Sequence, residues 1–314
     1  MKVRKKRLKK AVFNYARSAA NSMGYDIRAT SIRHSDFPIS LSSGAKLNLH
    51  LPPEKANGLP KGRQRELTLV YLSVGSEGLD LLENSISSAR RCGFNGEISV
   101  FCQGPGIEHL RKLEREHSVR VVSIGSAGGE ALKGVSNFGE GDFAAITHLK
   151  WEVILRSLDE HHKVVAFVDS DIVFLRKFED YFLKASEHYS VGIQSESRGF
   201  FPPAFCVGLM FFTFSAREFL AQVAATTNSH SSQGTAQQIF NEIVLGNPGL
   251  LSQILALPEA VFPVGLSYPL VKGPAHPLQV HQSEIIAFHA NWVLGNDAKK
   301  EMLDSLGLWE VPVA

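Results

Sequence analysis

The sequence predicts an α/β fold in which a mostly parallel sheet is flanked by helices and preceded by a basic, helical N-terminal extension. The 314 residues are 44% hydrophobic and 20% charged, an ordinary composition for a globular protein long enough to bury a full core. From Leu67 onward, short apolar runs alternate with helical patterns, which favours parallel strands joined by helices. We therefore expect an N-terminal helix and linker over residues 1–66 and an α/β domain over residues 67–314.

The predicted elements of the domain follow one another in a regular order. The predicted strands are 67–75, 97–104, 119–125 and 163–175, and the predicted helices between them are 81–93, 107–118 and 144–161, with a Gly-rich stretch at 126–141. The strand runs are short and apolar, whereas the helical runs repeat apolar residues every three or four positions. After Arg176 the order loosens into strand-like runs at 191–195 and 207–214, a helix near Ala216, and further runs at 234–246 and 284–303. Ligands of such sheets bind beyond the carboxyl ends of the strands.

The N-terminus is strongly basic. Its first ten residues, MKVRKKRLKK, hold seven of the 33 Lys and Arg residues and no acid, and apolar residues follow at helical spacing. Two interpretations remain open: a basic amphipathic helix that contacts anionic lipid, and a solvated tail. We expect no nucleic-acid partner.

Other features of the chain bear on its compartment. No apolar run approaches the roughly 18 residues of a membrane span, and no signal-peptide core follows the basic residues. Cys92, Cys102 and Cys206 have no CxxC spacing, which is typical of reduced thiols. We expect a cytoplasmic protein with at most peripheral contact to the inner face of the membrane.

Two aspartates, Asp169 and Asp171, stand two residues apart in the apolar stretch VVAFVDSDIVFL. Burying one unpaired carboxylate costs several kcal/mol, so we expect the strand to end or turn at this pair beside a compensating cation. Carboxylate oxygens suit Mg²⁺ or Mn²⁺, and chelation by both side chains would require a bend at Ser170. An exposed pair of acids at a strand end is the alternative.

Three chemistries use an apolar strand followed by D-x-D. DSDIV fits the D-x-D-x-[TV] pattern of haloacid-dehalogenase phosphohydrolases, but no DD or GDxxxD follows it to complete their Mg²⁺ site. A structural cation site is a second possibility. The third is a glycosyltransferase in which D-x-D holds the metal that binds a nucleotide sugar.

The order of further motifs favours the third chemistry. HLKWEVILRSL precedes VVAFVDSD, and FCVGLMFFTFS, TAQQIFN and HANWVLGNDAKKEML follow it. From about Leu67 to Leu303 the chain resembles retaining GT-A glycosyltransferases of the nucleotide-diphospho-sugar transferase group, akin to families GT77 and GT8. The resemblance implies a Rossmann-like GT-A fold. It also implies metal-dependent transfer, with retention, from a nucleoside-diphosphate sugar, a UDP-sugar in the first place, to a carbohydrate or glycolipid acceptor.

The resemblance also assigns roles to individual residues. Its implied metal ligands for Mn²⁺, or Mg²⁺, are Asp169, Asp171 and His289. The implied donor-binding residues are Ser73, Gly75, Lys150, Asp169, Gly208, Gly295 and Lys299, with Lys300 as a substitute for Lys299, and the implied catalytic residues are Gln237 and Asp171.

Two positions depart from the family pattern. Cys206 stands where the family strand has Asn, and Ala236 stands where an Asp precedes Gln237. The missing acid opens an alternative, a catalytically impaired homologue that binds a nucleotide sugar or serves as a scaffold. It also leads us to expect that Ala236→Asp raises turnover of a hexose donor. The sequence identifies no acid beside Gln237.

Overall fold

A computed structural model describes residues 66–125, 143–161, 164–196, 204–229, 235–265 and 285–311. The predicted N-terminal helix, nearly all of the linker and the Gly-rich segment 126–141 lie outside these residues. The chain divides into two compact units, Met1–Asn48 and Leu49–Ala314, and every described residue belongs to the second unit. Over the described ranges, no helix has both the length and the apolar character that crossing a membrane requires.

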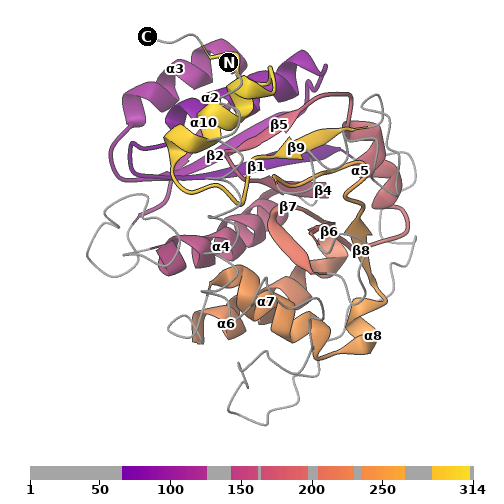
Figure 1. Cartoon of the computed structure of the whole chain (residues 1–314). Coiled ribbons are helices and arrows are strands. Elements are labelled where there is room, and N and C mark those ends of the chain that lie inside the picture. The colour runs from indigo at the N-terminus through magenta and orange to yellow at the C-terminus, as the bar shows by residue number, and fades with distance from the viewer. Residues whose placement is uncertain are drawn as a thin grey trace. The chain divides into compact units, whose positions relative to one another are not determined.

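A seven-stranded sheet forms the centre of the second unit, with the strand order β3-β2-β1-β4-β7-β6-β8 (Figure 1). The strands are β1 (Leu67–Val74), β2 (Glu97–Gln103), β3 (Arg120–Ser123), β4 (Val164–Val168), β6 (Val191–Ser195), β7 (Phe205–Phe212) and β8 (Ile254–Leu257). Neighbouring strands pair in parallel except at β7, which is antiparallel to both β4 and β6. The prediction of a mostly parallel sheet flanked by helices is confirmed.

Helices cover both faces of this sheet (Figure 1). They are α2 (Leu79–Arg91), α3 (Ile107–His117), α4 (Phe143–His161), α5 (Glu179–Ala185), α6 (Arg217–Ser229), α7 (Ala236–Leu245), α8 (Pro248–Leu251) and α10 (Asn296–Ser305), with a short 3₁₀ turn, η2, at Phe214–Ala216. Sequence signals explain where some of them begin. Thr235 and Gln238 form a reciprocal capping box at the start of α7, which satisfies two backbone N–H groups that the helix itself leaves free.

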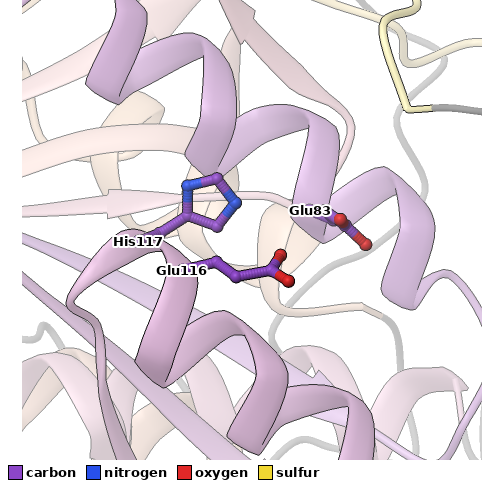
Figure 2. Close-up of side chains that lie close together, drawn as sticks. All are labelled: Glu83, Glu116 and His117. Carbon is purple, nitrogen blue, oxygen red and sulfur yellow. The ribbon is translucent and has the colours of Figure 1, made fainter.

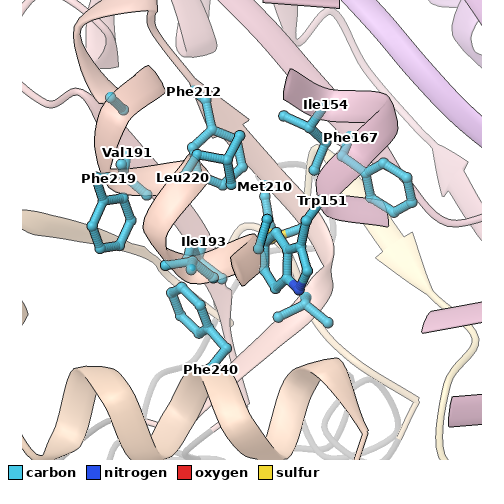
Figure 3. Close-up of a cluster of buried hydrophobic side chains, with 14 of the residues drawn as sticks. Trp151, Ile154, Phe167, Val191, Ile193, Met210, Phe212, Phe219, Leu220 and Phe240 are labelled. Carbon is cyan, nitrogen blue, oxygen red and sulfur yellow. The ribbon is translucent and has the colours of Figure 1, made fainter. Parts of the chain in front are cut away.

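Two apolar clusters hold the layers together. On one face, side chains of α4, α6 and α7 pack against β4, β6 and β7, with the rings of Trp151 and Phe240 stacked at 5.6 Å (Figure 3). On the other face, side chains of α2, α3 and α5 pack against β1, β2 and β4. Full burial of one such side chain stabilises the fold by about 1.5–3 kcal/mol. These clusters include residues of β1 and β4, so they stabilise the part of the sheet where these two strands end.

The predicted strand 163–175 is two strands in the structure. β4 ends at Val168, a turn follows, and β5 (Ile172–Phe174) pairs antiparallel with β9 (Ala287–His289) in a separate two-stranded sheet. The backbone N–H of Ile172 donates to the carbonyl of Asp169, which closes the turn. The expectation that the strand ends at the aspartate pair is confirmed, and the expectation of one continuous strand is wrong.

Candidate metal and nucleotide-sugar site

The aspartates lie at the carboxyl end of β4, a strand in the middle of the large sheet. Ile172 is the register partner of His289 in the β5–β9 pair, so the small sheet brings His289 to the turn that carries Asp169 and Asp171. One ligand atom from each of these three residues lies within 4.8 Å of the others. His289 Nε2 is 3.2 Å from Asp171 Oδ1 and 4.0 Å from Asp169 Oδ2. Two carboxylates and an imidazole suit Mn²⁺ or Mg²⁺, so these residues could hold such an ion.

Two lysines neutralise part of the negative charge of this group. Lys150 from α4 lies 2.7 Å from Asp169, and Lys299 from α10 lies 2.8 Å from Asp171. Burial alone would raise the pKa of Asp171, but the Lys299 ammonium and the His289 imidazole hold that pKa well below its usual range. The cation that the burial argument requires is therefore supplied in part by side chains of the chain itself.

Gly208 permits the close approach of β7 to the group. A β-carbon at this position would lie 2.2 Å from the His289 ring and 2.8 Å from Asp169 Oδ2, distances at which atoms collide. The Gly208 carbonyl accepts a hydrogen bond of 2.8 Å from the Asp169 backbone N–H. Any side chain at position 208 would therefore displace the carboxylate or the imidazole.

Gln237, at the start of α7, faces an acid, Glu196, to which no sequence motif gave a role. Its Nε2 donates to Glu196 Oε1 at 2.6 Å, and its Oε1 accepts from the Val207 backbone N–H at 3.3 Å. The Trp292 indole N–H also donates to Glu196, at 3.2 Å. Glu196 directly follows β6 as Asp169 directly follows β4, and this position after an apolar run was the available signal.

The Glu196 carboxyl group is half-buried, and its pKa is raised. The pKa is raised from its ordinary value of 4.5 to about 8, mainly by desolvation and also by the nearby Glu259 carboxylate, against hydrogen bonds from Trp292 and Gln237 that lower it. The folded protein therefore binds this proton more tightly than the unfolded chain does.

Glu196→Gln should make the stability of the protein less sensitive to pH. Because the folded-state pKa is the higher one, the wild type loses stability as the pH rises from about 4.5 through about 8. The neutral Gln variant lacks this loss, so we expect it to be more stable by about 1–2 kcal/mol at pH 8.5, after allowance for solvent screening, and nearly equal at pH 4. Urea unfolding at both values measures this, with exposed Glu187→Gln as the control. Parallel pH curves for wild type and Glu196→Gln would contradict it.

Ser73, Gly75 and Gly295 belong to a neighbouring region rather than to the carboxylate group. An open groove of about 860 Å³ is lined by residues 76–80, His109, residues 294–298, Lys300 and Glu301. Ser73 and Gly75 lie at the end of β1, directly before the first lining segment, and Gly295 is part of the second. The groove thus lies where α2 and α10 begin. Lys300 pairs with Asp80 and with Asp297, whereas Lys299 points to Asp171.

Ala236 and Cys206, the two departures from the family pattern, are both buried. The Ala236 methyl group is 0% exposed and belongs to the apolar cluster that contains Trp151 and Phe240. Cys206 Sγ lies 3.5 Å from His289 Nδ1 and accepts a hydrogen bond of 3.5 Å from Asn291 Nδ2. Position 236 therefore faces the core, whereas position 206 touches the candidate metal ligand.

A second group of possible metal ligands, Glu83, Glu116 and His117, lies between α2 and α3 (Figure 2). Lys112 lies 3.0 Å from Glu83 and 3.7 Å from Glu116, and His117 Nε2 is 3.3 Å from the Ser87 hydroxyl. Each member is thus partnered by the chain, and no role is assigned to this group.

Comparison with known proteins gives the family. The model of the nucleotide-diphospho-sugar transferase family matches residues 108–303, more than half of the chain. Among curated proteins no sequence matches.

Several solved glycosyltransferase structures are similar to this chain at low sequence identity. The apo form of the glycosyltransferase GlyE of Streptococcus pneumoniae TIGR4 is 12% identical with a TM-score of 0.50, covering 72% of this chain and 54% of GlyE. Mouse xyloside xylosyltransferase 1 is 13% identical with a TM-score of 0.48, covering 72% of this chain and 98% of its own. The galactosyltransferase LgtC, solved with donor and acceptor sugar analogs, is 12% identical with a TM-score of 0.47, and the match covers 79% of this chain and 97% of LgtC. The chain spans about half the length of GlyE, and the likeness concerns the fold.

The seven-stranded sheet, the acidic turn after β4 and the family match agree with one another. The chain has a GT-A-like fold and belongs to the nucleotide-diphospho-sugar transferase family.

Proposed function

We propose that this chain is a metal-dependent glycosyltransferase that moves a sugar, with retention, from a nucleoside-diphosphate sugar, a UDP-sugar in the first place, to a carbohydrate or glycolipid acceptor. The observation that carries the proposal is the convergence of Asp169, Asp171 and His289 at the carboxyl end of β4. Ligands of open α/β sheets bind at this edge. The DSDIV stretch gains no support as a phosphohydrolase motif, because the chain belongs to a transferase family.

The proposed metal ligands are Asp169, Asp171 and His289, for Mn²⁺ or Mg²⁺. A divalent ion bound there would supply positive charge against the negative charge that develops on the departing diphosphate. Lys299 and Lys150 place ammonium groups at the same edge of the sheet, on Asp171 and Asp169. In the proposal, both contribute to diphosphate binding and charge stabilisation.

The start of α10 is the proposed diphosphate contact. Gly295, the residue before the helix, has φ +81°. Among the residues that the structure describes, no side chain caps the helix, and a β-carbon at Gly295 would meet no atom within 4 Å. Free backbone N–H groups at a helix N-terminus favour anions. The adjoining groove beyond Ser73 and Gly75 is the proposed place of the nucleoside.

Gln237 is the proposed group beside the reacting sugar carbon, with Gly208 beside the donor sugar. Val207 and Glu196 fix both ends of the Gln237 amide. An amide is a weak nucleophile and Glu196 is held largely neutral at pH 7, so neither supplies a strong carboxylate nucleophile. This favours attack by the acceptor on the face that the leaving group departs from, which gives retention.

The alternative is a homologue that binds a nucleotide sugar without turnover, and its motive is Ala236. Donor hydrolysis across a panel of nucleotide sugars separates the two, since a scaffold binds without hydrolysing. Peripheral membrane contact through residues 1–10 remains a prediction from charge, which co-sedimentation with anionic vesicles at low salt would test.

Calorimetric binding of UDP should require Mn²⁺, and Lys299→Gln should weaken it about tenfold. An ionic hydrogen bond contributes about 1.5–3 kcal/mol, and 1.4 kcal/mol is tenfold in affinity. Lys300→Gln is the matched comparison, because its ammonium pairs with Asp80 and Asp297 instead, and we expect its affinity to stay within about twofold. If Lys300→Gln loses more UDP affinity than Lys299→Gln, then Lys300 rather than Lys299 is the lysine that contacts the diphosphate. Failure of UDP to bind with Mn²⁺ would refute the proposed function.

A further inference from the structure

Gln194 is a buried polar side chain to which the sequence assigned no role. It lies on β6, is 1% exposed, and touches His289 from the side opposite the aspartates. Its Nε2 donates to the Phe262 backbone carbonyl at 2.9 Å, and its Oε1 lies 2.9 Å from His289 Nδ1. Both ends of the amide are thus used, which is the expected state of a buried carboxamide.

The pairing of β6 with β7 places Gln194 there. Ile193 pairs with Met210, but the register then shifts and Gln194 pairs with Cys206, so residues 207–209 of β7 have no partner in β6. Irregular pairing of this kind redirects side chains and is common beside functional sites. Here it places Gln194 opposite Cys206, next to the His289 ring.

These contacts determine which nitrogen of His289 carries the proton. A backbone carbonyl can only accept, so the amide nitrogen of Gln194 must face Phe262 and the amide oxygen must face His289. An oxygen acceptor at 2.9 Å requires a proton on Nδ1. The Cys206 thiol, at 3.5 Å from Nδ1, is the competing partner, but it is farther away and a weaker hydrogen-bonding group.

The other ring nitrogen then faces the carboxylates. Nε2 is 3.2 Å from Asp171 Oδ1 and 4.0 Å from Asp169 Oδ2. With Nδ1 committed to Gln194, Nε2 is the nitrogen left for a divalent cation. A proton on Nε2 would donate to Asp171 in the metal-free site, and a bound cation would take the place of that proton. Without Gln194, Nδ1 would lose its oxygen acceptor, so displacing the Nε2 proton from the side of Asp171 would leave the remaining proton on Nδ1 without that hydrogen bond, and cation binding would become less favourable.

We propose that Gln194 is a positioning residue that keeps His289 protonated on Nδ1 and thereby offers Nε2 to a divalent cation between Asp169 and Asp171. The cation itself rests on the proposed function, whereas the proton position follows from the hydrogen bonds. Hydrogen-bond partners of metal-binding histidines orient the ring and fix its tautomer, and their loss lowers metal affinity 10–100-fold.

The first test is Mn²⁺ binding to the full-length protein, measured by calorimetry. Gln194→Met keeps the length and apolar bulk of the side chain but removes both hydrogen bonds, and we expect a roughly 10–100-fold weaker Mn²⁺ affinity. Gln194→Glu in its neutral form can accept from Nδ1 and donate to Phe262, so we expect it to stay within about threefold of wild type. Gln222→Met makes the same change on the half-buried face of α6 and should leave the affinity unchanged. Equal losses in Gln194→Met and Gln194→Glu, or no loss in Gln194→Met, would overturn the proposal.

The second test does not depend on metal binding or on the behaviour of Gln194→Met. In histidine-¹⁵N-labelled wild-type protein without metal, a resonance that disappears in His289→Ala should show a proton on Nδ1. The same signal should persist in Gln194→Glu. A bare Nδ1 in the wild type would overturn the inference even if Mn²⁺ binds. A protonated Nδ1 in a protein that never binds Mn²⁺ would support the positioning and refute the proposed metal function.

Discussion

Asp171→Asn should abolish Mn²⁺-dependent binding of a nucleoside diphosphate while the protein remains folded. Of the three proposed ligands, Asp171 contacts both the His289 imidazole and the Lys299 ammonium, and its side chain is 5% exposed. Asn keeps the volume and one acceptor oxygen but removes the charge that holds a cation. Loss of a charged contact to a cation costs at least about 1.5–3 kcal/mol, so we expect calorimetric Mn²⁺ affinity to fall about 100-fold.

The fold should survive this change, because Lys299, at 26% exposed, can turn toward water when its partner loses charge. Asp304→Asn is the matched control, since its exposed side chain lies on the same helix as Lys299. His289→Ala should weaken Mn²⁺ binding about tenfold by removing a single neutral ligand. If Asp171→Asn and His289→Ala both bind Mn²⁺ as tightly as the wild type, the ligand assignment is wrong.

The place of the aspartates could be predicted from the sequence, because burial cost acts locally. Ten apolar or small residues surround Asp169 and Asp171 in VVAFVDSDIVFL, so two carboxylates there had to mark the end of a strand. The structure confirms that β4 ends at Val168. The sequence does not show that residues 172–174 leave the large sheet and pair with β9. A three-residue apolar run is equally suited to pairing in the large sheet or in the small one.

Long-range pairing carries the parts of the site that the sequence did not reveal. Gln194 lies within β6 and its partner His289 is 95 residues away. Glu196 lies just after β6 and its partner Gln237 is 41 residues away. No local pattern encodes such partners. The direction of β7 is another example, because an apolar run has the same composition in a parallel and an antiparallel strand.

The lysines show a different limit. The resemblance assigned Lys150 and Lys299 to the donor, whereas in the structure each ammonium lies on an aspartate. Both statements can hold, because two adjacent carboxylates, one of them buried, need positive charge whether or not a ligand is bound. A motif match indicates what each lysine contacts when the donor is bound. It does not indicate the aspartate that each lysine contacts in the protein without ligand.

Ala236→Asp is expected to destabilise the protein by about 3 kcal/mol at pH 7, and this replaces the sequence-based expectation of higher turnover. The Ala236 methyl group is 0% exposed in the apolar cluster of Trp151 and Phe240. An acid at the first position of α7 would gain about 0.3–1 kcal/mol from the helix N-terminus, but burying a carboxylate costs several kcal/mol. The backbone N–H of Ala236 already donates to the Thr147 hydroxyl at 3.2 Å, so that donor is not free to stabilise the new charge.

Urea unfolding at pH 7 and pH 4 measures this expectation, together with donor hydrolysis across a panel of nucleotide sugars. Burial would raise the pKa of the new carboxyl group, so the loss of stability should be smaller at pH 4, where the group is neutral. Ala221→Asp, at a half-buried position of α6, is the control and should cost less than about 1 kcal/mol. If Ala236→Asp is as stable as the wild type at pH 7 and hydrolyses a hexose donor faster, the new carboxylate has reached the site instead of the core. In that case the acid that the family pattern places before Gln237 is what this chain lacks, and Glu196 does not replace it.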